Sequence, residues 1–215
     1  VTETVPSQIT LTAGAGVTLT RLLTFALKGS LSGLEFLSGI PGSLGGALAM
    51  NAGAQGKEMK DVTDTITLLT PQAEVIEKNS GELQFSYRSL ALSKGTVILK
   101  AVLKMKQSTR NILLGRIEKI NQWRRRVQPL NLPSAGSVFK NPPGQSAGQL
   151  VEQAGLKGFT LGNAQISDKH ANFIVNRGGA TARDVLSLMD IMQNRVYKAT
   201  GIQLEPELCI TGENG

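Results

Sequence analysis

The sequence predicts an α+β protein that divides into two domains. In some segments apolar residues recur at helical spacing, as over residues 18–28 and 108–126, whereas over residues 96–106 they alternate with polar ones. The chain has 215 residues, 40% of them hydrophobic, which is enough to bury a sizeable core. Composition changes after residue 107, where we expect the first domain to end.

In the first half, one helix and several strands are expected. The helix covers residues 18–28 with Leu19, Leu22 and Ala26 on one face, and Gly29 is placed to end it. A turn at Pro71 separates two strands. The strands are expected over residues 9–11, 65–69, 75–76 and 96–106.

In the second half, helices are more prominent. A helix over residues 108–126 is stopped by Pro129 and Pro133, and a short helix with capping-box spacing at Ser146 closes at Gly155. A third helix begins at Thr181 with Asp184 three residues later. Strands are expected over residues 171–176 and 204–210.

The most unusual segment is the glycine-rich run over residues 33–56, GLEFLSGIPGSLGGALAMNAGAQG. Glycine lets the main chain approach a ligand closely and weakens helices and strands. The run offers few side chains for a large core, and its glycines alternate with apolar residues instead of the Ser or Asp of a solvated linker. It therefore predicts a backbone surface against which a flat cofactor lies.

Charge and cysteine content narrow the functional classes. Lys and Arg exceed Asp and Glu to give a net charge of +7, which favours an anionic partner. Aromatic residues that would stack on bases are only 4% of the chain, so a small phosphorylated ligand fits better than nucleic acid. The single cysteine, Cys209, suits a reducing compartment, and no apolar run predicts a membrane span or a signal peptide.

Several common catalytic signatures are missing. Gly14 and Gly16 begin the spacing of a dinucleotide fingerprint, but Leu19 stands at the third glycine position. The only histidine, His170, has no histidine or cysteine partner at ligand spacing, so we expect no metal site. Taken by itself, Ser137 in SAGSVFKNP is read as a turn or cap residue.

Five short segments together are more specific than any one of them. In chain order, GIPGSLGGALAMNAGA, FSYRS, QPLNLPSAGSVFKNP, DKHANFIVN and LEPELCITG resemble the motifs of the UDP-N-acetylenolpyruvoylglucosamine reductase (MurB) family. The resemblance implies part of an FAD-binding domain of the vanillyl-alcohol-oxidase (PCMH-like) type with a mostly antiparallel sheet. A smaller α/β sandwich for the substrate follows. The expected division is 1–107, 108–202 and a final strand in 203–215 that belongs to the first FAD subdomain.

The resemblance implies a cytoplasmic flavin-dependent oxidoreductase of peptidoglycan synthesis, and so of cell-wall formation, cell shape and cell division. NADPH would reduce FAD and leave. The enolpyruvyl ether of UDP-N-acetylglucosamine would then take the hydride on its methylene carbon, giving UDP-N-acetylmuramate. We expect a monomer that binds neither nucleic acid nor membranes.

Three catalytic residues follow from the matching motifs. Arg88 in FSYRS would stabilise the charge that builds up on the substrate carboxylate. A guanidinium can bind both carboxylate oxygens at once, which the ammonium of a lysine cannot do. Ser137 matches the general acid that protonates the alpha carbon. Glu207 matches the residue that helps to polarise the carboxylate, because the register before CITG selects it over Glu205.

The resemblance also implies contacts with substrate and cofactor. Residues expected to contact the UDP portion or the substrate are Tyr87, Arg125, Arg126, Lys140, Asn141 and His170. For several of these a structural role stays open; the arginine run, for example, also suits a helix C-terminus. Residues expected at the FAD are Gly39, Ile40, Pro41, Gly42, Gly45, Gly46, Asn51, Ala52 and Gly53.

The sequence departs from the family pattern in two places, and each departure leads to a prediction. Little sequence separates Arg88 from Ser137, so the tyrosine-bearing loop of some members is not expected and the chain resembles the loopless subclass. The glycine-serine loop that grips the FAD pyrophosphate in the family has no counterpart in these residues. The chain by itself is therefore expected to bind FAD poorly.

Two other functional classes stay open on the sequence alone. One is a non-catalytic domain that binds an anionic nucleotide sugar or RNA through its basic surface. The other is a flavoenzyme of the same architecture with another substrate. The FSYRS, SAGSVFKNP and LEPEL motifs argue against the second, because in the family they serve a carboxylate-bearing enol ether.

Overall fold

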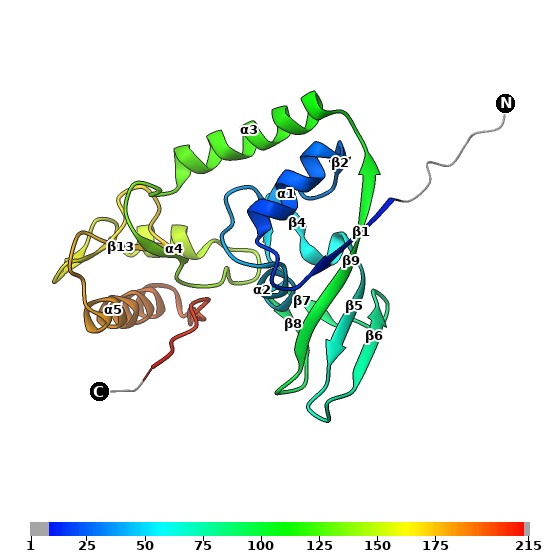
Figure 1. Ribbon diagram of the computed structural model, residues 1–215. Helices are drawn as coiled ribbons and strands as arrows, with labels where there is room; N and C mark the ends of the chain where they lie inside the picture. Colours follow the sequence, from blue (N-terminus) through cyan, green and yellow to red (C-terminus); the bar gives the residue numbers. More distant parts are fainter. Residues whose placement is uncertain (1–8, 213–215) are drawn as a thin grey trace. The chain divides into compact units, whose positions relative to one another are not determined.

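The computed structural model describes residues 9–212 and confirms the α+β class (Figure 1). The chain forms two compact units, residues 1–122 and 123–215. Each unit has its own antiparallel sheet and its own cluster of buried apolar side chains. The two units are described separately below.

The first unit is built around a five-stranded antiparallel sheet. Figure 1 shows β9 (Val97–Gln107) running between its neighbours β1 and β5, and the full order is β1-β9-β5-β6. The fifth strand, β2, is short and pairs with the last two residues of β9. The other strands are β1 (Ile9–Gly14), β2 (Leu31–Ser32), β5 (Thr63–Leu69) and β6 (Val75–Asn79), which confirms the strands predicted in this half.

The helices and helical turns of this unit supply half of the buried apolar residues in its core. α1 (Leu19–Lys28) begins after Thr18, whose side chain accepts a hydrogen bond from the Arg21 N–H, and it buries Leu19 and Leu22. The helical turn η1 (Glu35–Leu37) and helix α2 (Leu44–Ala49) follow.

The glycine-rich run contributes far more to the core than its composition predicts. Leu34, Leu44 and Leu48 are fully buried, and α2 forms although two of its six residues are glycines. Tertiary packing of the apolar face provides the stability that glycine withholds from an isolated helix. The expectation that this run packs little core is therefore wrong.

Two small hairpins complete the first unit. One pairs β3 (Gly53–Ala54) with β4 (Lys57–Glu58), followed by the helical turn η2 (Met59–Asp61). The other pairs β7 (Phe85–Ser86) with β8 (Ser89–Leu90).

The helix α3 (Arg110–Val127) crosses the division between the units, which falls after residue 122 instead of the expected 107. Polar contacts along residues 116–121 hold it to the first unit. The Ser38 hydroxyl donates to Asn121 Oδ1 at 2.7 Å, and Arg116 pairs with Glu35 at 3.0 Å. Periodicity in the sequence does not reveal these side-chain bonds.

The second unit contains a four-stranded antiparallel sheet in the order β10-β13-β12-β11. Helix α5 packs against β11 and β12 and against α4. Its elements are β10 (Ser134–Ser137), α4 (Ala147–Gln153), β11 (Thr160–Leu161), β12 (Ala164–Ile166), β13 (Phe173–Asn176) and α5 (Ala182–Thr200).

The helix ends of this unit follow the sequence closely. Thr181 and Asp184 form a complete capping box at the start of α5, and the Ser146 hydroxyl caps α4. Gly201 ends α5 in the left-handed conformation with φ of 73°. Local capping chemistry therefore sets where both helices begin.

The C-terminal segment differs from expectation. Instead of a strand over 204–210 that belongs to another subdomain, Leu204 is buried in the second unit and Pro206 makes an isolated bridge to Phe139. Two hydrogen bonds flank the bridge, from Lys140 N–H to the Glu205 carbonyl and from Glu207 N–H to the Val138 carbonyl, both at 2.8 Å. Proline has no N–H and cannot extend a ladder. Residues 213–215 lie outside the described range.

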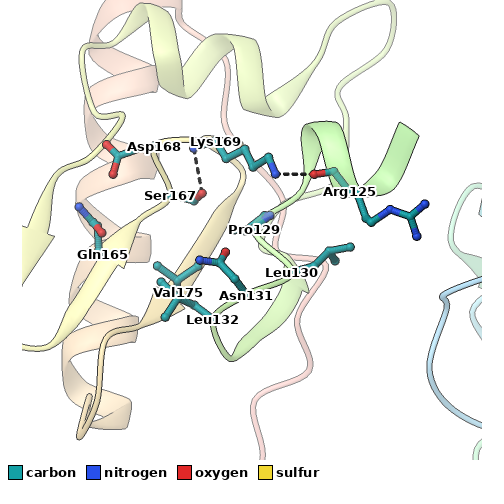
Figure 2. A pocket seen from close by; sticks show the side chains of 10 residues that line it. All are labelled: Arg125, Pro129, Leu130, Asn131, Leu132, Gln165, Ser167, Asp168, Lys169 and Val175. Atoms are coloured by element: carbon teal, nitrogen blue, oxygen red, sulfur yellow. Dashed lines mark hydrogen bonds between the residues drawn. The ribbon is translucent and has the colours of Figure 1, made fainter. Parts of the chain in front are cut away.

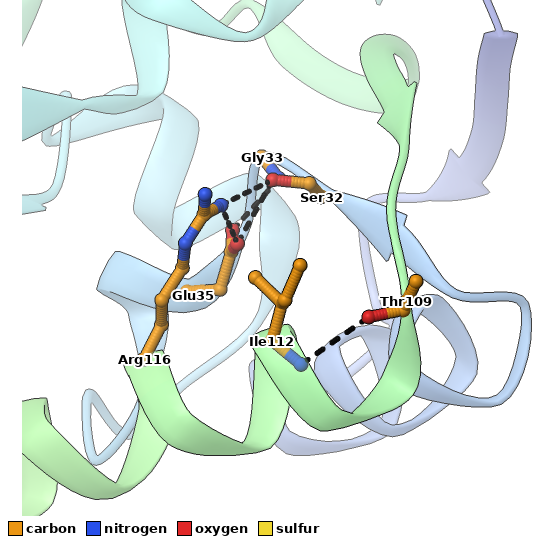
Figure 3. A network of polar contacts seen from close by, with 6 residues as sticks. All are labelled: Ser32, Gly33, Glu35, Thr109, Ile112 and Arg116. Carbon is orange, nitrogen blue, oxygen red and sulfur yellow. Dashed lines mark hydrogen bonds and ion pairs between the residues drawn. The ribbon is translucent and has the colours of Figure 1, made fainter.

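A buried carboxylate ties the first unit together in Figure 3. Glu35, 9% exposed, accepts hydrogen bonds from Gly33 N–H at 2.7 Å, the Ser32 hydroxyl at 2.9 Å and Arg116 at 3.0 Å. Burial by itself would raise the pKa of Glu35, but these hydrogen bonds outweigh it and lower the pKa below its ordinary value of 4.5.

Glu35→Gln should lower the free energy of unfolding of the first unit by about 1–3 kcal/mol at neutral pH, because it places an amide against donors that need an acceptor. The folded pKa of Glu35 lies below 4.5, so its stabilisation is present above that pH and is lost as the pH falls through the folded pKa. Urea unfolding at neutral and acidic pH measures both effects.

The matched control is Glu77→Gln, which removes one charge from an exposed pair with Lys100 and should cost less than about 1 kcal/mol. An equal loss of stability in both variants, or a Glu35→Gln effect that persists undiminished in acid, would contradict the account.

Candidate functional site

Polar and apolar side chains line a pocket of about 660 Å³ in the second unit (Figure 2). The Lys169 ammonium donates to the backbone carbonyl of Arg125, whose guanidinium points away from Lys169. The Ser167 hydroxyl accepts from the Lys169 N–H at 3.1 Å and holds the turn between β12 and β13. The lining residues are Arg125, Pro129, Leu130, Asn131, Leu132, Gln165, Ser167, Asp168, Lys169 and Val175.

Ser137 and Glu207 lie on neighbouring backbone segments. Ser137 is the last residue of β10, and the register with β13 shifts between Ser134 and Ser137 because β10 has one extra residue there. The Val138 carbonyl accepts the Glu207 N–H at 2.8 Å. The fold therefore joins, by one hydrogen bond, the residue after Ser137 to a glutamate near the other end of this unit's sequence.

Lys140 forms an ion pair with Glu205, and their backbones are hydrogen-bonded as well. The Lys140 side chain is 24% exposed, whereas that of Glu205 is 68% exposed. The two glutamates of LEPEL thus differ in environment: Glu205 balances a lysine, and Glu207 lies beside the segment that follows Ser137.

Asn141 and His170 lie in the same unit and have structural contacts. Asn141 Oδ1 accepts the N–H of Ala147 at the first residue of α4. His170 Nδ1 accepts the Asn172 N–H at 3.2 Å, which leaves the proton of the neutral ring on Nε2. Gly148 leaves room for this ring, because a Cβ there would lie 3.0 Å from Cε1 of His170.

Arg88 and Tyr87 lie in the first unit, in the turn between β7 and β8. Arg88 has a φ of 55°, an uncommon conformation for a non-glycine residue. Its guanidinium donates to the Gly53 carbonyl at 3.4 Å and lies 5.0 Å from the centre of the Tyr87 ring. These contacts orient Arg88 although its backbone conformation is disfavoured.

Asn51 is fully buried beneath this turn. Its amide donates to the Ser86 carbonyl at 2.9 Å and to Glu58 at 3.0 Å, and its carbonyl accepts the Lys60 N–H. Asn51 therefore joins the hairpin that carries Arg88 to the hairpin that carries Gly53. All three of these side-chain bonds have partners within the first unit, two of them backbone groups and one the Glu58 carboxylate.

The glycines expected at a cofactor fall into two groups. A Cβ at Gly45 would lie 2.9 Å from that of Ala15, and one at Gly53 would lie 2.4 Å from the Lys57 carbonyl, so internal packing explains both. Gly39, Gly42 and Gly46 are exposed, and a Cβ at Gly42 or Gly46 would have no contact closer than 3.6 Å.

Gly46 is the most informative of these residues. It lies in α2 and an exposed glycine there costs about 1 kcal/mol relative to alanine, yet no neighbour within the unit requires it. A molecule lying against this backbone would explain it. Of the other expected contacts, Pro41 is exposed, while Ile40 and Ala52 pack against the core.

Family models cover both units. Residues 1–79 match the FAD binding domain, and residues 128–211 match the C-terminal domain of UDP-N-acetylenolpyruvoylglucosamine reductase. The reductase of that name from Heliobacterium modesticaldum is 45% identical over 95% of this chain and 66% of its own length. That of Caldanaerobacter subterraneus is 45% identical over 94% of this chain and 67% of its own.

A solved structure agrees. The crystal structure of UDP-N-acetylenolpyruvylglucosamine reductase (MurB) from Thermus caldophilus matches with a TM-score of 0.81 at 41% identity, covering 92% of this chain and 71% of that one. The chain belongs to the UDP-N-acetylenolpyruvoylglucosamine reductase family. It spans about two-thirds of the length of the curated relatives.

In this member of the reductase family, the expected site residues divide between the units. Arg88, Tyr87 and the glycine positions lie in the first unit. The second unit holds Ser137, Glu207, Lys140, Asn141, His170, Arg125 and Arg126. Arg126 is exposed near the end of α3.

Sequence reasoning missed two residues of the second unit, Lys169 in the pocket and the buried Asn172. Asn172 had a weak signal: an asparagine stands inside an apolar segment predicted as strand, where its β propensity is low.

Among the described residues, no group of three or more His, Cys, Asp or Glu side chains gathers as a metal site would require. Within residues 9–212, no helix is long and apolar enough to cross a bilayer.

Burial lowers the pKa of His170 below its ordinary value of 6.5. A backbone hydrogen bond raises this pKa, but the effect of burial is larger. We expect the ring to be neutral at pH 7 and folding stability to fall as the pH drops below 6.5, because the unfolded chain takes up the proton first.

The chain has one histidine, so NMR titration of its ring protons gives an unambiguous value. The same titration in denaturant, where the pKa should return close to 6.5, is the control. A folded pKa at or above that value would contradict the account.

Proposed function

We propose that this chain takes part in the NADPH-dependent, FAD-mediated reduction of UDP-N-acetylglucosamine enolpyruvate to UDP-N-acetylmuramate in peptidoglycan synthesis. The observation that carries the proposal is the hydrogen bond that joins Glu207 to the residue after Ser137, within a segment that matches the family's C-terminal domain. The comparisons with relatives support the same reaction.

The first unit has residues that suit FAD. Gly39, Gly42 and Gly46, which are all exposed, would lie against it, and a Cβ at Gly42 or Gly46 would meet no atom of the unit closer than 3.6 Å. When bound, FAD supplies a carrier that accepts hydride from NADPH and delivers it to the methylene carbon of the enolpyruvyl group.

Arg88 would bind the substrate carboxylate. Reduction of the double bond pushes negative charge toward this group, and a preoriented guanidinium can accept it through two parallel hydrogen bonds. The contacts of Arg88 with Gly53 and Tyr87 support such preorientation. We assign Glu207 to polarise the same carboxylate.

Ser137 would donate the proton that completes the reduction. The methylene carbon gains a hydride, and the carbon that bears the carboxylate then gains a proton, here from Ser137 Oγ, which is replenished from solvent. A hydroxyl is a weak acid, so its position must supply much of the rate.

The nucleotide portion would bind in the second unit. The 660 Å³ pocket has a size typical of small-molecule sites, and the Lys169 ammonium provides positive charge among apolar lining residues such as Leu130 and Val175. We assign Arg125, which also lines the pocket, as a contact of the substrate. We assign Tyr87, Arg126, Lys140, Asn141 and His170 as further contacts of the UDP portion or of the rest of the substrate, with neutral His170 as an Nε2–H donor.

We infer a monomeric, cytoplasmic enzyme that acts without nucleic acid or membrane partners, with a role in cell shape and division. The exposed, unpaired Cys209 suits a reducing compartment. A non-catalytic domain for a nucleotide sugar or RNA is not favoured, since relatives over 95% of the chain are named as the reductase.

Ser137→Ala in the full-length, flavin-loaded protein should slow reoxidation by the enolpyruvyl substrate by about 100- to 10,000-fold, because a positioned acid is lost. Flavin reduction by NADPH should be unchanged, since it needs no proton from Ser137. Stopped-flow absorbance measures each half-reaction separately.

Ser134→Ala is the matched control, because Ser134 is an exposed serine in the same strand. Equal slowing of both half-reactions in Ser137→Ala, or similar slowing in Ser134→Ala, would reject Ser137 as the acid.

A further inference from the structure

We propose that Asn172 is a positioning residue that holds Ser137 in place for proton donation. The inference rests on the proposed function, because it assigns a role to the neighbour of the proposed acid. Asn172 is 3% exposed and precedes β13, and neither sequence motifs nor the family comparisons assign it a role.

The side chain of Asn172 is bonded to both polar backbone groups of Phe139. Its Nδ2 donates to the Phe139 carbonyl at 2.8 Å, and its Oδ1 accepts the Phe139 N–H at 3.0 Å. The backbone carbonyl of Asn172 accepts the Val138 N–H at 2.9 Å. One residue thus makes three hydrogen bonds to the two residues that follow Ser137.

These bonds replace a strand ladder that stops at Ser137. Ser137 pairs with Phe173, and the extra residue in β10 has already disturbed the register before it. Phe139 is fully buried, so its N–H and carbonyl need partners within the protein. The Asn172 amide supplies an acceptor and a donor where the backbone of β13 no longer can.

The segment after Ser137 is also held from its other side. The Val138 carbonyl accepts the Glu207 N–H, and the Lys140 N–H donates to the Glu205 carbonyl. With Asn172 on one side and residues 205–207 on the other, the backbone that follows Ser137 has little freedom. The direction of the Ser137 hydroxyl depends on that backbone, which is how Asn172 would act on the reaction without touching substrate.

Asparagine is the residue that this geometry needs. An aspartate in place of Asn172 would still accept the Phe139 N–H, but its second oxygen would face the Phe139 carbonyl in a buried setting, where an unmatched polar contact is costly.

The test compares Asn172→Asp with Asn176→Asp in the full-length, flavin-loaded protein. Asn176 Oδ1 accepts from Gly178 and Ala180 N–H, contacts that aspartate keeps, so this control should behave as wild type. Asn172→Asp should slow reoxidation by the enolpyruvyl substrate by about 10- to 100-fold, as expected for a small misplacement, and leave flavin reduction unchanged.

The decisive arm is the double variant. If Asn172 acts through Ser137, Asn172→Asp should cause no further slowing of reoxidation in a Ser137→Ala background. The lower Tm expected from its unmatched buried oxygen should persist there. Slowing of the same size in both backgrounds, equal slowing of both half-reactions, or a normal rate in folded Asn172→Asp would each overturn the inference.

The geometric part has a readout that does not depend on catalysis. In Asn172→Ala, hydrogen exchange at the Phe139 amide should speed up while that at core amides of α5 is retained, and unchanged protection would overturn the inference even if Asn172→Asp fails to fold. A normal reoxidation rate in Ser137→Ala itself would instead reject the proposed function, and slowing by Asn172→Asp in that case would show action through another group.

Discussion

The hydrogen bonds that hold residues 138–140 are the constraint on which the candidate site of the second unit depends. A strand with one extra residue ends at Ser137, and a buried phenylalanine follows whose backbone groups must be satisfied. Asn172 meets this need from one side, and the C-terminal segment at 205–207 meets it from the other. Segments far apart in the chain thereby converge next to one serine, and Glu207 arrives as part of the same backbone pairing.

In the first unit, the glycine-rich run combines exposed backbone with buried core side chains. Leucines of the glycine-rich run are buried, two of them on α2, and Gly39, Gly42 and Gly46 remain exposed. The Glu35 network fixes the start of this run, and Asn51 fixes the hairpins that carry Gly53 and Arg88. Rigid support beneath an open backbone is what a site for a flat, anionic cofactor requires.

Local signals allowed much of this fold to be predicted. The capping box at Thr181, the cap at Thr18 and the alternation along residues 96–106 each depend on neighbours in sequence, and each element formed where expected. The family and the α+β class were also predictable, because several motifs occur in the right order. The sequence could not show which glycines pack internally, since the contact of Gly45 with Ala15 depends on the tertiary fold.

Long-range bonds explain the remaining differences. Residues 116 and 121 of α3 are bonded to Glu35 and Ser38 of the first unit, which lie about eighty residues earlier in the chain. The strand expected over 204–210 reduces to a bridge at Pro206, and Asn172 finds its partners thirty-three residues away at Phe139. Neither hydrophobic periodicity nor helix-cap residues in the sequence can predict such long-range contacts.

The central claim is that Ser137 is held where it can protonate the substrate. The most direct measurement is a crystal structure of the full-length protein with FAD and the enolpyruvyl substrate bound. The account predicts Ser137 Oγ within about 3.5 Å of the carbon that bears the carboxylate, with the Asn172–Phe139 bonds intact. A Ser137 hydroxyl turned away from that carbon, with another donor in its place, would contradict it.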